Sequence, residues 1–307
     1  MLTFAFCTYK RSGRLARLVA AMRAQQCLEP FEILAVNNNS PDDTLHVLER
    51  LARLPGAPLR YVTETEQGIV PARNRALAEA MGSDILVFID DDELPLSGLL
   101  LAAANAVRGE GARCAGGKID VDLSGFRRPN WLGDELLGFL GAVQHSANPL
   151  WVTDESTPIW AGNVAYDMSL FRDDPSLRFD SRYNRRGSVV GGGEDVMMFR
   201  ALLARGVPIR YRPDMAVLHA VEPWRLRRRY FLNIHYRAGL QYGLFELAEY
   251  PRRVLGVPPF LVGQLLRQCL KTVAIAARGR GGVLRQAMNV AHAWGVIVGC
   301  AQRAARV

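Results

Sequence analysis

The sequence predicts an α/β fold, in which a mostly parallel sheet is flanked by helices and followed by a basic helical extension. Over residues 1–90, short apolar runs alternate with amphipathic stretches, which is the pattern of βαβ units. Of the 307 residues, 49% are hydrophobic and 22% are charged, so the chain can bury a large core. Residues 1–220 hold 24 Lys and Arg against 27 Asp and Glu, whereas residues 221–307 hold 14 against 3. This asymmetry places a boundary near residue 220.

The first 90 residues predict four strands separated by three helices. Short apolar runs indicate buried strands, and apolar residues spaced three and four apart indicate helices that pack one face on a sheet. The expected strands are Leu2–Cys7, Phe31–Val36, Leu59–Val62 and Asp84–Ile89; the expected helices carry Leu15, Leu18, Val19 and Met22, then Leu45, Leu48 and Ala52, and then span Val70–Ala80.

Residues 95–220 are richer in aromatic and turn-forming residues than the first 90. A long stretch without regular periodicity carries Trp131, Trp151 and Trp160. We divide the chain into a first half-domain over residues 1–115, a second over 116–220, and an extension over 221–307. The expected elements of the middle part are a helix Leu99–Val107, a strand near Arg113–Val121, a glycine-rich loop Gly187–Gly193, a helix Glu194–Ala204, and short strands Pro208–Arg212 and Ala216–His219.

The sequence lacks the patterns that are typical of several classes of protein. The five cysteines are scattered and never form C-x-x-C, which argues against a disulfide framework or a zinc knuckle. The N-terminus lacks a signal-peptide pattern, and no uncharged apolar run reaches the ~18–20 residues of a spanning helix. No G-x-G-x-x-G follows the first strand and no P-loop occurs, which argues against dinucleotide redox chemistry and P-loop phosphoryl transfer. We expect a cytoplasmic protein.

Four acids, Asp90 to Glu93, follow the most apolar strand directly. Open α/β sheets bind ligands at the carboxyl ends of their strands, so these acids stand where a ligand is expected. Crowded carboxylates repel unless a cation neutralises them, and the alternation Asp90-x-Asp92 suits a divalent ion that also binds a diphosphate. The alternative is a run of acids that starts a helix.

Three further side chains could carry chemistry in the second half. Glu194 and Asp195 follow three glycines and open a helix, so a carboxylate there could act as a general base. The alternative is a turn with an N-capping acid. His219 ends an apolar run and could complete an oxygen-rich metal site if carboxylates converge on it. The alternative is a structural histidine.

Amides and a guanidinium follow the second and third strands. The run Asn37 to Asn39 could read a nucleotide base edge, and Arg73 could neutralise a phosphate. The alternatives are ordinary turn chemistry for the amides and a solvated helix face for the arginine.

In order along the chain, these motifs resemble glycosyltransferase family 2, the inverting enzymes of the GT-A fold. The resemblance covers residues 1–220, and it is greatest to bacterial enzymes that build exopolysaccharide repeat units. It rests on Phe4-Ala5-Phe6-Cys7-Thr8-Tyr9-Lys10-Arg11, Ala35-Val36-Asn37-Asn38-Asn39-Ser40, Gln67-Gly68-Ile69-Val70-Pro71-Ala72-Arg73-Asn74, Val87-Phe88-Ile89-Asp90-Asp91-Asp92-Glu93, Gly193-Glu194-Asp195, Tyr211-Arg212-Pro213-Asp214 and His219.

The resemblance implies a role for each of these side chains. The donor nucleotide sugar would be bound first, a divalent ion, Mn²⁺ or Mg²⁺, would bridge its diphosphate, and a carboxylate would deprotonate the acceptor hydroxyl. The implied donor-binding residues are Thr8, Asn38, Arg73, Asp90 and Asp91, the metal ligands are Asp92 and His219, and the base is Asp195 with Glu194 beside it; Trp160 and Asn163 are candidate acceptor contacts.

The implied function is the inverting transfer of one sugar from a nucleotide-diphosphate sugar to a hydroxyl of a lipid-linked saccharide, in exopolysaccharide or cell-surface glycan synthesis. A UDP-sugar such as UDP-glucose is favoured. Asn37 to Asn39 stand where family members often carry acids, which leaves guanine and thymine donors open. Two alternatives are a non-catalytic protein on the same scaffold that binds a nucleotide sugar or a membrane, and a sugar nucleotidyltransferase.

The extension over residues 221–307 mixes arginines with apolar and aromatic residues, beginning at Trp224-Arg225-Leu226-Arg227-Arg228-Arg229. This composition suits helices that lie on an anionic membrane surface. No nucleic-acid motif accompanies the arginines, so we expect no nucleic-acid partner. The alternative is a helical packing or oligomerisation segment with a solvated basic face. We therefore expect a peripheral protein on the inner face of the cytoplasmic membrane.

Overall fold

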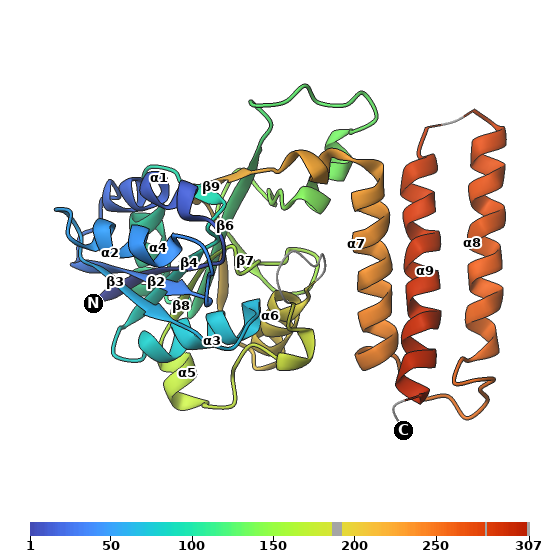
Figure 1. Cartoon of the computed structure of the whole chain (residues 1–307). Helices are drawn as coiled ribbons and strands as arrows, with labels where there is room; N and C mark the ends of the chain where they lie inside the picture. The colour runs from blue at the N-terminus through green and yellow to red at the C-terminus, as the bar shows by residue number, and fades with distance from the viewer. Residues whose placement is uncertain (186–191, 280, 306–307) are drawn as a thin grey trace. The chain divides into compact units, whose positions relative to one another are not determined.

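The computed structural model describes residues 1–185, 192–279 and 281–305, which divide into two compact units. Of the described residues, the first unit holds 1–185 and 194–221, and the second holds 192–193, 222–279 and 281–305 (Figure 1). The elements of the first unit are β1 Leu2–Thr8, α1 Ser12–Arg23, β2 Phe31–Asn37, α2 Thr44–Ala52, β3 Leu59–Thr63, α3 Ile69–Glu79, β4 Ile85–Ile89, β5 Glu93–Pro95, α4 Leu99–Arg108, β6 Cys114–Asp122, η1 Asp134–Leu140, β7 Leu150–Val152, β8 Asn163–Asp167, α5 Ser169–Asp173, η2 Ser181–Tyr183, α6 Glu194–Ala204 and β9 Ile209–Ala220.

One sheet runs through the first unit in the order β3-β2-β1-β4-β8-β6-β9-β5, and β7 pairs with β9. The four strands β3, β2, β1 and β4 are parallel, as the alternating pattern predicts. Helices α1 and α2 cover one face of this half and α3 the other (Figure 1). Because both faces are covered, the central strands β1 and β4 are almost wholly buried, and Leu2, Phe4 and Phe6 of β1 are fully inaccessible to solvent. The α/β prediction is confirmed.

The second half of the sheet is mixed, whereas the sequence predicted a mostly parallel sheet. Strand β8 is antiparallel to both β4 and β6, and β5 and β7 are antiparallel to β9. None of β5, β7 and β8 was predicted, because each is short and lies in turn-rich sequence. Their strand conformation is imposed by pairing with distant segments rather than by local propensity.

Strand β9 is continuous, although the sequence predicted two separate strands, Pro208–Arg212 and Ala216–His219. The register between β6 and β9 shifts at Gly117/Lys118, and this irregularity accommodates the proline-containing stretch. A Cβ on Gly117 would lie 1.6 Å from the carbonyl oxygen of Met215, so only glycine allows the two backbones this close. The continuous strand carries His219 to the same edge of the sheet as the acids that follow β4.

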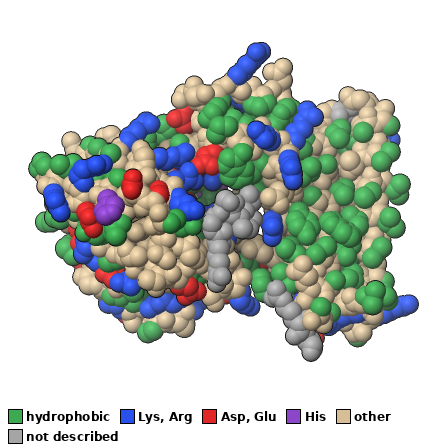
Figure 2. Space-filling model, in the orientation of Figure 1, with side chains coloured by type: hydrophobic (Ala, Val, Ile, Leu, Met, Phe, Trp, Pro, Cys, Tyr) green, Lys and Arg blue, Asp and Glu red, His purple; other side chains and the backbone are tan. Residues whose placement is uncertain are grey.

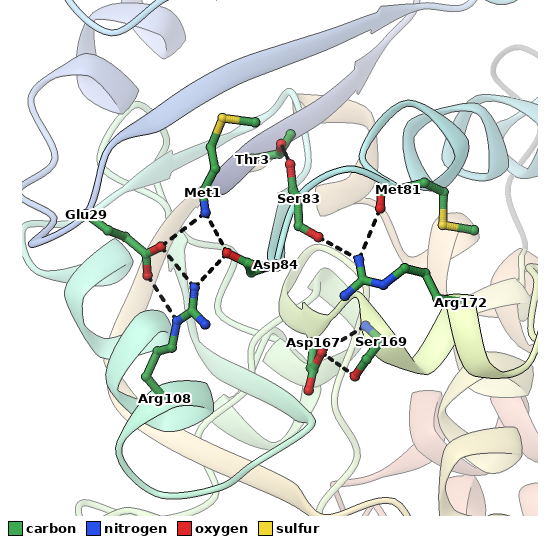
Figure 3. A network of polar contacts seen from close by, with 10 residues as sticks. All are labelled: Met1, Thr3, Glu29, Met81, Ser83, Asp84, Arg108, Asp167, Ser169 and Arg172. Carbon is green, nitrogen blue, oxygen red and sulfur yellow. Dashed lines mark hydrogen bonds and ion pairs between the residues drawn. The ribbon is translucent and has the colours of Figure 1, made fainter.

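At the other end of the parallel strands, where they begin, polar contacts join neighbouring segments (Figure 3). Arg108 pairs with Asp84 at 2.9 Å and with Glu29 at 3.2 Å. Arg172 donates to the carbonyl oxygens of Met81 and Ser83. These contacts tie the start of β4 to its neighbours and leave the carboxyl ends of the parallel strands for the site described below.

The second unit is helical, with η3 Pro223–Leu226, α7 Arg228–Gln241, a π-helical turn η4 Tyr242–Glu246, α8 Pro259–Ala277 and α9 Val283–Ala304. Helix α9 lies between α7 and α8 (Figure 1). Among the described residues, α8 is the single helix whose length and apolar composition would suffice to cross a membrane. The sequence shows no uncharged apolar run of this length, because Arg267 and Lys271 interrupt the apolar residues of α8.

Candidate functional site

The carboxyl ends of β1, β2 and β4 bring the predicted donor-binding residues to one edge of the sheet. The Thr8 hydroxyl donates a hydrogen bond to Asp91 Oδ2 at 2.7 Å, although 83 residues separate them. Asn38 follows β2, and its backbone N–H donates to the Thr8 carbonyl. Parallel pairing explains this convergence, because it brings the carboxyl ends of neighbouring strands to the same edge of the sheet.

Arg73, on α3, forms a buried bridge between two parts of the site. Its Nη2 donates to Asp90 Oδ1 at 2.9 Å, and its Nη1 donates to Glu194 Oε1 at 2.8 Å. Its guanidinium also lies 5.6 Å from the ring centre of Phe179. Burial lowers the pKa of Arg73, but the facing carboxylates raise it more strongly, so it stays charged. The arginine is therefore inside the site, which excludes the alternative of a solvated helix face.

The acids after β4 are crowded and partly buried. Burial and the neighbouring Asp92 raise the pKa of Asp91 to about 7, although the Thr8 hydroxyl opposes this shift. Burial, with Asp90 and Asp92 nearby, raises the pKa of Glu93 well above its ordinary value. Glu93 Oε2 accepts a hydrogen bond from the backbone N–H of Asp90 and so closes the turn. The carboxylates at this edge repel one another, which is the condition that favours a bound cation.

Asp92 and His219 are neighbours, with 3.6 Å between Asp92 Oδ2 and His219 Nε2. Their side chains are 10% and 8% exposed, so both face inward from the edge. Within residues 1–185, 192–279 and 281–305, no three His, Cys, Asp or Glu side chains converge as a complete metal cage.

The pair fits an ion that a substrate completes. An octahedral Mg²⁺ with ligands at about 2.1 Å has neighbouring ligands about 3 Å apart, close to the observed separation. Such ions are commonly held by one or two carboxylates together with substrate phosphates. An oxygen ligand with one imidazole is also a donor set that Mn²⁺ accepts. The residues present therefore fit Mn²⁺ or Mg²⁺.

The structure separates the two acids at the start of α6. The Glu194 side chain is 4% exposed and paired with Arg73, whereas Asp195 is partly exposed. Burial raises the pKa of Glu194, although Arg73 opposes the shift. Asp195 Oδ1 accepts a hydrogen bond from the N–H of Val196 at 2.8 Å, so its carboxylate is oriented at the helix start. Of the two acids, Asp195 is the one with accessible surface. Residues 186–191, which include most of the predicted glycine-rich loop, lie outside the described residues.

Two of the predicted contact residues have amides committed to backbone groups. Asn38 Nδ2 donates to the carbonyls of Glu64 and Glu66, and Asn38 Oδ1 accepts from Gly68 N–H at 2.8 Å. Asn38 therefore shapes the loops at this edge instead of presenting a free amide edge.

Asn163, at the start of β8, is 1% exposed. Its Nδ2 donates to the carbonyls of Lys118 and Met215, beside the irregular register of β6 and β9. Trp160 lies three residues earlier, is partly exposed, and packs against the core. Of the two candidate acceptor contacts, Trp160 is the one with accessible surface.

Sequence reasoning assigned no role to Glu93 and Phe179. Glu93 was visible as the last member of an acidic run, but nothing local showed that it turns back to the Asp90 backbone and pairs in register with His219. Phe179 is 106 residues from Arg73 in the chain. Asn74 holds the Phe179 backbone through two hydrogen bonds, so its position depends wholly on tertiary structure.

Comparison with known proteins found a matching family model, a curated relative and similar solved structures. The family model described as glycosyl transferase family 2 matches residues 3–174. This chain is 37% identical to the uncharacterized glycosyltransferase YfnE of Bacillus subtilis (strain 168) over 93 residues, which are 30% of its own length. The match spans 23% of that protein's length.

The fold is that of solved GT-A glycosyltransferases. Mannosyltransferase PcManGT from Pyrobaculum calidifontis, solved with GDP-Man and Mn²⁺, is 18% identical, with a TM-score of 0.60 over 96% of this chain and 86% of that chain. S. aureus TarS 1-349, solved with UDP-GlcNAc, is 17% identical, with a TM-score of 0.56 over 81% of this chain and 68% of that one. GalNAc-T7, solved with UDP, GalNAc and Mn²⁺, is 14% identical, with a TM-score of 0.56 over 80% and 48%. The predicted fold class is confirmed.

Proposed function

Because the chain belongs to glycosyl transferase family 2, we propose that it is an inverting glycosyltransferase that moves one sugar from a nucleotide-diphosphate sugar to an acceptor hydroxyl. One observation carries the proposal. Buried Arg73 joins Asp90, at the donor end of the parallel strands, to Glu194, at the start of α6. Asp195 directly follows Glu194 in α6 and is partly exposed, which supports it as the general base.

The proposed reaction needs one proton transfer and one displacement. The Asp195 carboxylate accepts the proton of the acceptor hydroxyl. The hydroxyl oxygen attacks the anomeric carbon from the face opposite the diphosphate, and the bond between that carbon and the diphosphate oxygen breaks. The nucleoside diphosphate leaves with the electron pair, so configuration inverts and no covalent enzyme intermediate forms.

Asp92 and His219 would hold Mn²⁺ or Mg²⁺ against the diphosphate. When bound, the ion neutralises the negative charge that develops on the departing diphosphate. The chain's own contribution is to hold Asp92 and the imidazole at 3.6 Å and to keep both largely buried. PcManGT and GalNAc-T7 were solved with Mn²⁺, which supports testing this ion first.

The finer assignment is a UDP-sugar donor, with UDP-glucose first, and a lipid-linked saccharide acceptor in exopolysaccharide or cell-surface glycan synthesis. The side-chain amide of Asn38 is already hydrogen-bonded to the loop backbone. The nucleotide base of the donor would therefore contact the loop backbone that Asn38 orders, rather than the amide itself. Trp160 offers an apolar ring on which an acceptor sugar could stack. The basic helical unit supports peripheral association with the cytoplasmic face of an anionic membrane.

The test is a donor screen with the full chain, Mn²⁺, and UDP-, GDP- and dTDP-sugars. We expect slow donor hydrolysis without acceptor, faster release of nucleotide with a saccharide acceptor, and inverted configuration in the product. The Asp195→Asn variant sets the background. A protein whose melting temperature rises with a nucleotide sugar but that never turns it over would be a non-catalytic binder, and the proposal would be wrong.

A further inference from the structure

Helix α8 carries an apolar stripe on its outer surface. Val262, Leu266, Leu270 and Val273 are 46%, 59%, 70% and 66% exposed, which is unusual for large apolar side chains in a row. Their spacing of four, four and three residues completes eleven residues in three turns, so the stripe runs straight along the helix. Hydrophobic side chains gather over the helical unit in the view of Figure 2.

The opposite side of α8 is already occupied by α9. Leu261 is 5% exposed and packs in a small core with Val296 and Cys300 of α9. Gln286 of α9 donates from Nε2 to the side-chain oxygen of Gln268 at 2.7 Å. The stripe therefore cannot turn inward without breaking these contacts.

Helix α9 is itself fixed by unusually close packing on the segment α7–η4. Gly239 and Gly243 face Gly295 and Gly299 across this interface, each pair spaced four residues apart. A Cβ at any of the four would lie 2.1–2.3 Å from a carbonyl oxygen of the facing backbone. The segment α7–η4 therefore packs tightly on one side of α9, and α8 packs on another side of α9.

The charges around the stripe identify its partner. No Asp or Glu follows Glu249 in the sequence, whereas nine Lys and Arg do. Arg267 and Lys271 lie one turn apart beside the stripe, and both are exposed. A second copy of the chain would bring its own cations against these, whereas an anionic bilayer offers acyl chains to the stripe and phosphates to the cations.

We propose that α8 lies in the plane of an anionic bilayer, with its apolar stripe in the boundary between headgroups and acyl chains and with Arg267 and Lys271 at the phosphates. A crossing orientation would put both cations near the bilayer centre, where charged side chains are disfavoured. It would also draw Gln286 and Asn289 of α9 into hydrocarbon. If α8 lies parallel to the membrane plane, the whole stripe lies at one depth, about 5–10 Å into the bilayer, and α7 stays outside the bilayer. The inference rests on the membrane association proposed above and names the element responsible.

The first test is flotation of the full chain with phosphatidylcholine vesicles, with and without 30 mol% phosphatidylglycerol. We expect wild type to float only with the anionic vesicles, and Leu266→Ser/Leu270→Ser to bind at least tenfold more weakly. Arg267→Gln/Lys271→Gln should bind about 25-fold more weakly, since each cation contributes about fivefold. A matched control, Leu28→Ser/Leu54→Ser, removes two exposed leucines of the first unit, and it should float like wild type.

The second test measures depth. A fluorophore is attached to single cysteines at positions 262, 266, 270 and 273, with the accessible native cysteines replaced by serine, and quenched by lipids brominated at different depths. Equal shallow depths support the proposal. Greatest depth at 266 and 270 would show a crossing helix and overturn it.

Two further outcomes would also overturn it: no flotation of wild type, or a stable dimer that Leu266→Ser/Leu270→Ser dissolves. Donor turnover is measured on every variant in solution, away from vesicles. A chain that floats as expected but never transfers a sugar would refute the proposed function and leave this inference standing, and the reverse result would do the opposite.

Discussion

Replacement of the two adjacent acids of α6, one at a time, should separate a structural carboxylate from a catalytic one. The Glu194→Gln variant removes the ion pair between Arg73 and Glu194, whose atoms lie 2.8 Å apart. Arg73 keeps its ion pair with Asp90 at 2.9 Å. Both side chains of the lost ion pair are 4% exposed, so water cannot replace it. A buried hydrogen bond to a charged group contributes about 1.5–3 kcal/mol. Because a domain of this size loses roughly 2–4 °C per kcal/mol, the melting temperature should fall by roughly 3–12 °C.

Asp195→Asn should behave in the opposite way. Its carboxylate is partly exposed and accepts a hydrogen bond from Val196 N–H, which the amide oxygen of asparagine can also accept. Stability should therefore change by no more than about 0.5 kcal/mol. Loss of a general base should lower the rate of sugar transfer by roughly 10²–10⁴.

The assay combines thermal unfolding at pH 7 with transfer rates measured at least 15 °C below the lower melting temperature. Glu194→Gln should be unstable but should retain transfer within about tenfold of wild type, because Asp195 remains. Glu194→Ala, which removes the acceptor atom as well, should lose about 3–5 kcal/mol. The assignment is wrong if Glu194→Gln abolishes transfer at unchanged stability, or if Asp195→Asn transfers at the wild-type rate.

Three other changes test the metal pair, the helical unit and the acid response. Mn²⁺ with UDP at 100 times its dissociation constant should stabilise the wild type by about 2.7 kcal/mol. The Asp92→Ala variant should lose this thermal shift, whereas the control Asp173→Asn, which changes an exposed acid on α5, should keep it. Equal shifts in the two variants would contradict the metal assignment. The Gly295→Ala variant places a Cβ 2.1 Å from a backbone carbonyl oxygen of α7, so it should destabilise the second unit by about 1–3 kcal/mol in urea denaturation. The control Gly263→Ala adds a Cβ that meets no atom within 4 Å, and it should stabilise the unit by up to about 1 kcal/mol. Burial raises the pKa of Glu79, but two arginines lower it below the ordinary 4.5, so its contribution of about 1 kcal/mol is present above that pH and lost below it. The stability gap between wild type and Glu79→Gln should therefore close between pH 6 and pH 3, and a constant gap would refute the ion pairing.

Much of the first unit was predictable because its elements are locally encoded. Helix α6 begins and ends where the sequence predicted, at Glu194 and Ala204, and β4 differs from its prediction by one residue. Apolar periodicity within the segment is sufficient to indicate such elements. The convergence of Thr8 and Asp91 was also predictable in kind, because parallel strands put their carboxyl ends together.

Other features depended on contacts between distant residues. No local pattern distinguishes Glu194 from Asp195, and only the buried pairing with Arg73 determines which of the two is enclosed and which stays accessible. The continuity of β9 through Pro213 required a glycine on the neighbouring strand, about a hundred residues earlier in the chain.

The sequence by itself determined that this chain has an α/β domain with acids at the ends of its strands and a basic helical extension. Composition and periodicity are sufficient for that, since they report which faces must be buried. Only the tertiary structure decided which acid is buried against Arg73, that Asp92 lies 3.6 Å from His219, and that α8 keeps an apolar stripe outward. The physical reason is that burial and pairing of charges depend on residues brought together from distant parts of the chain, and their energies are set by that environment.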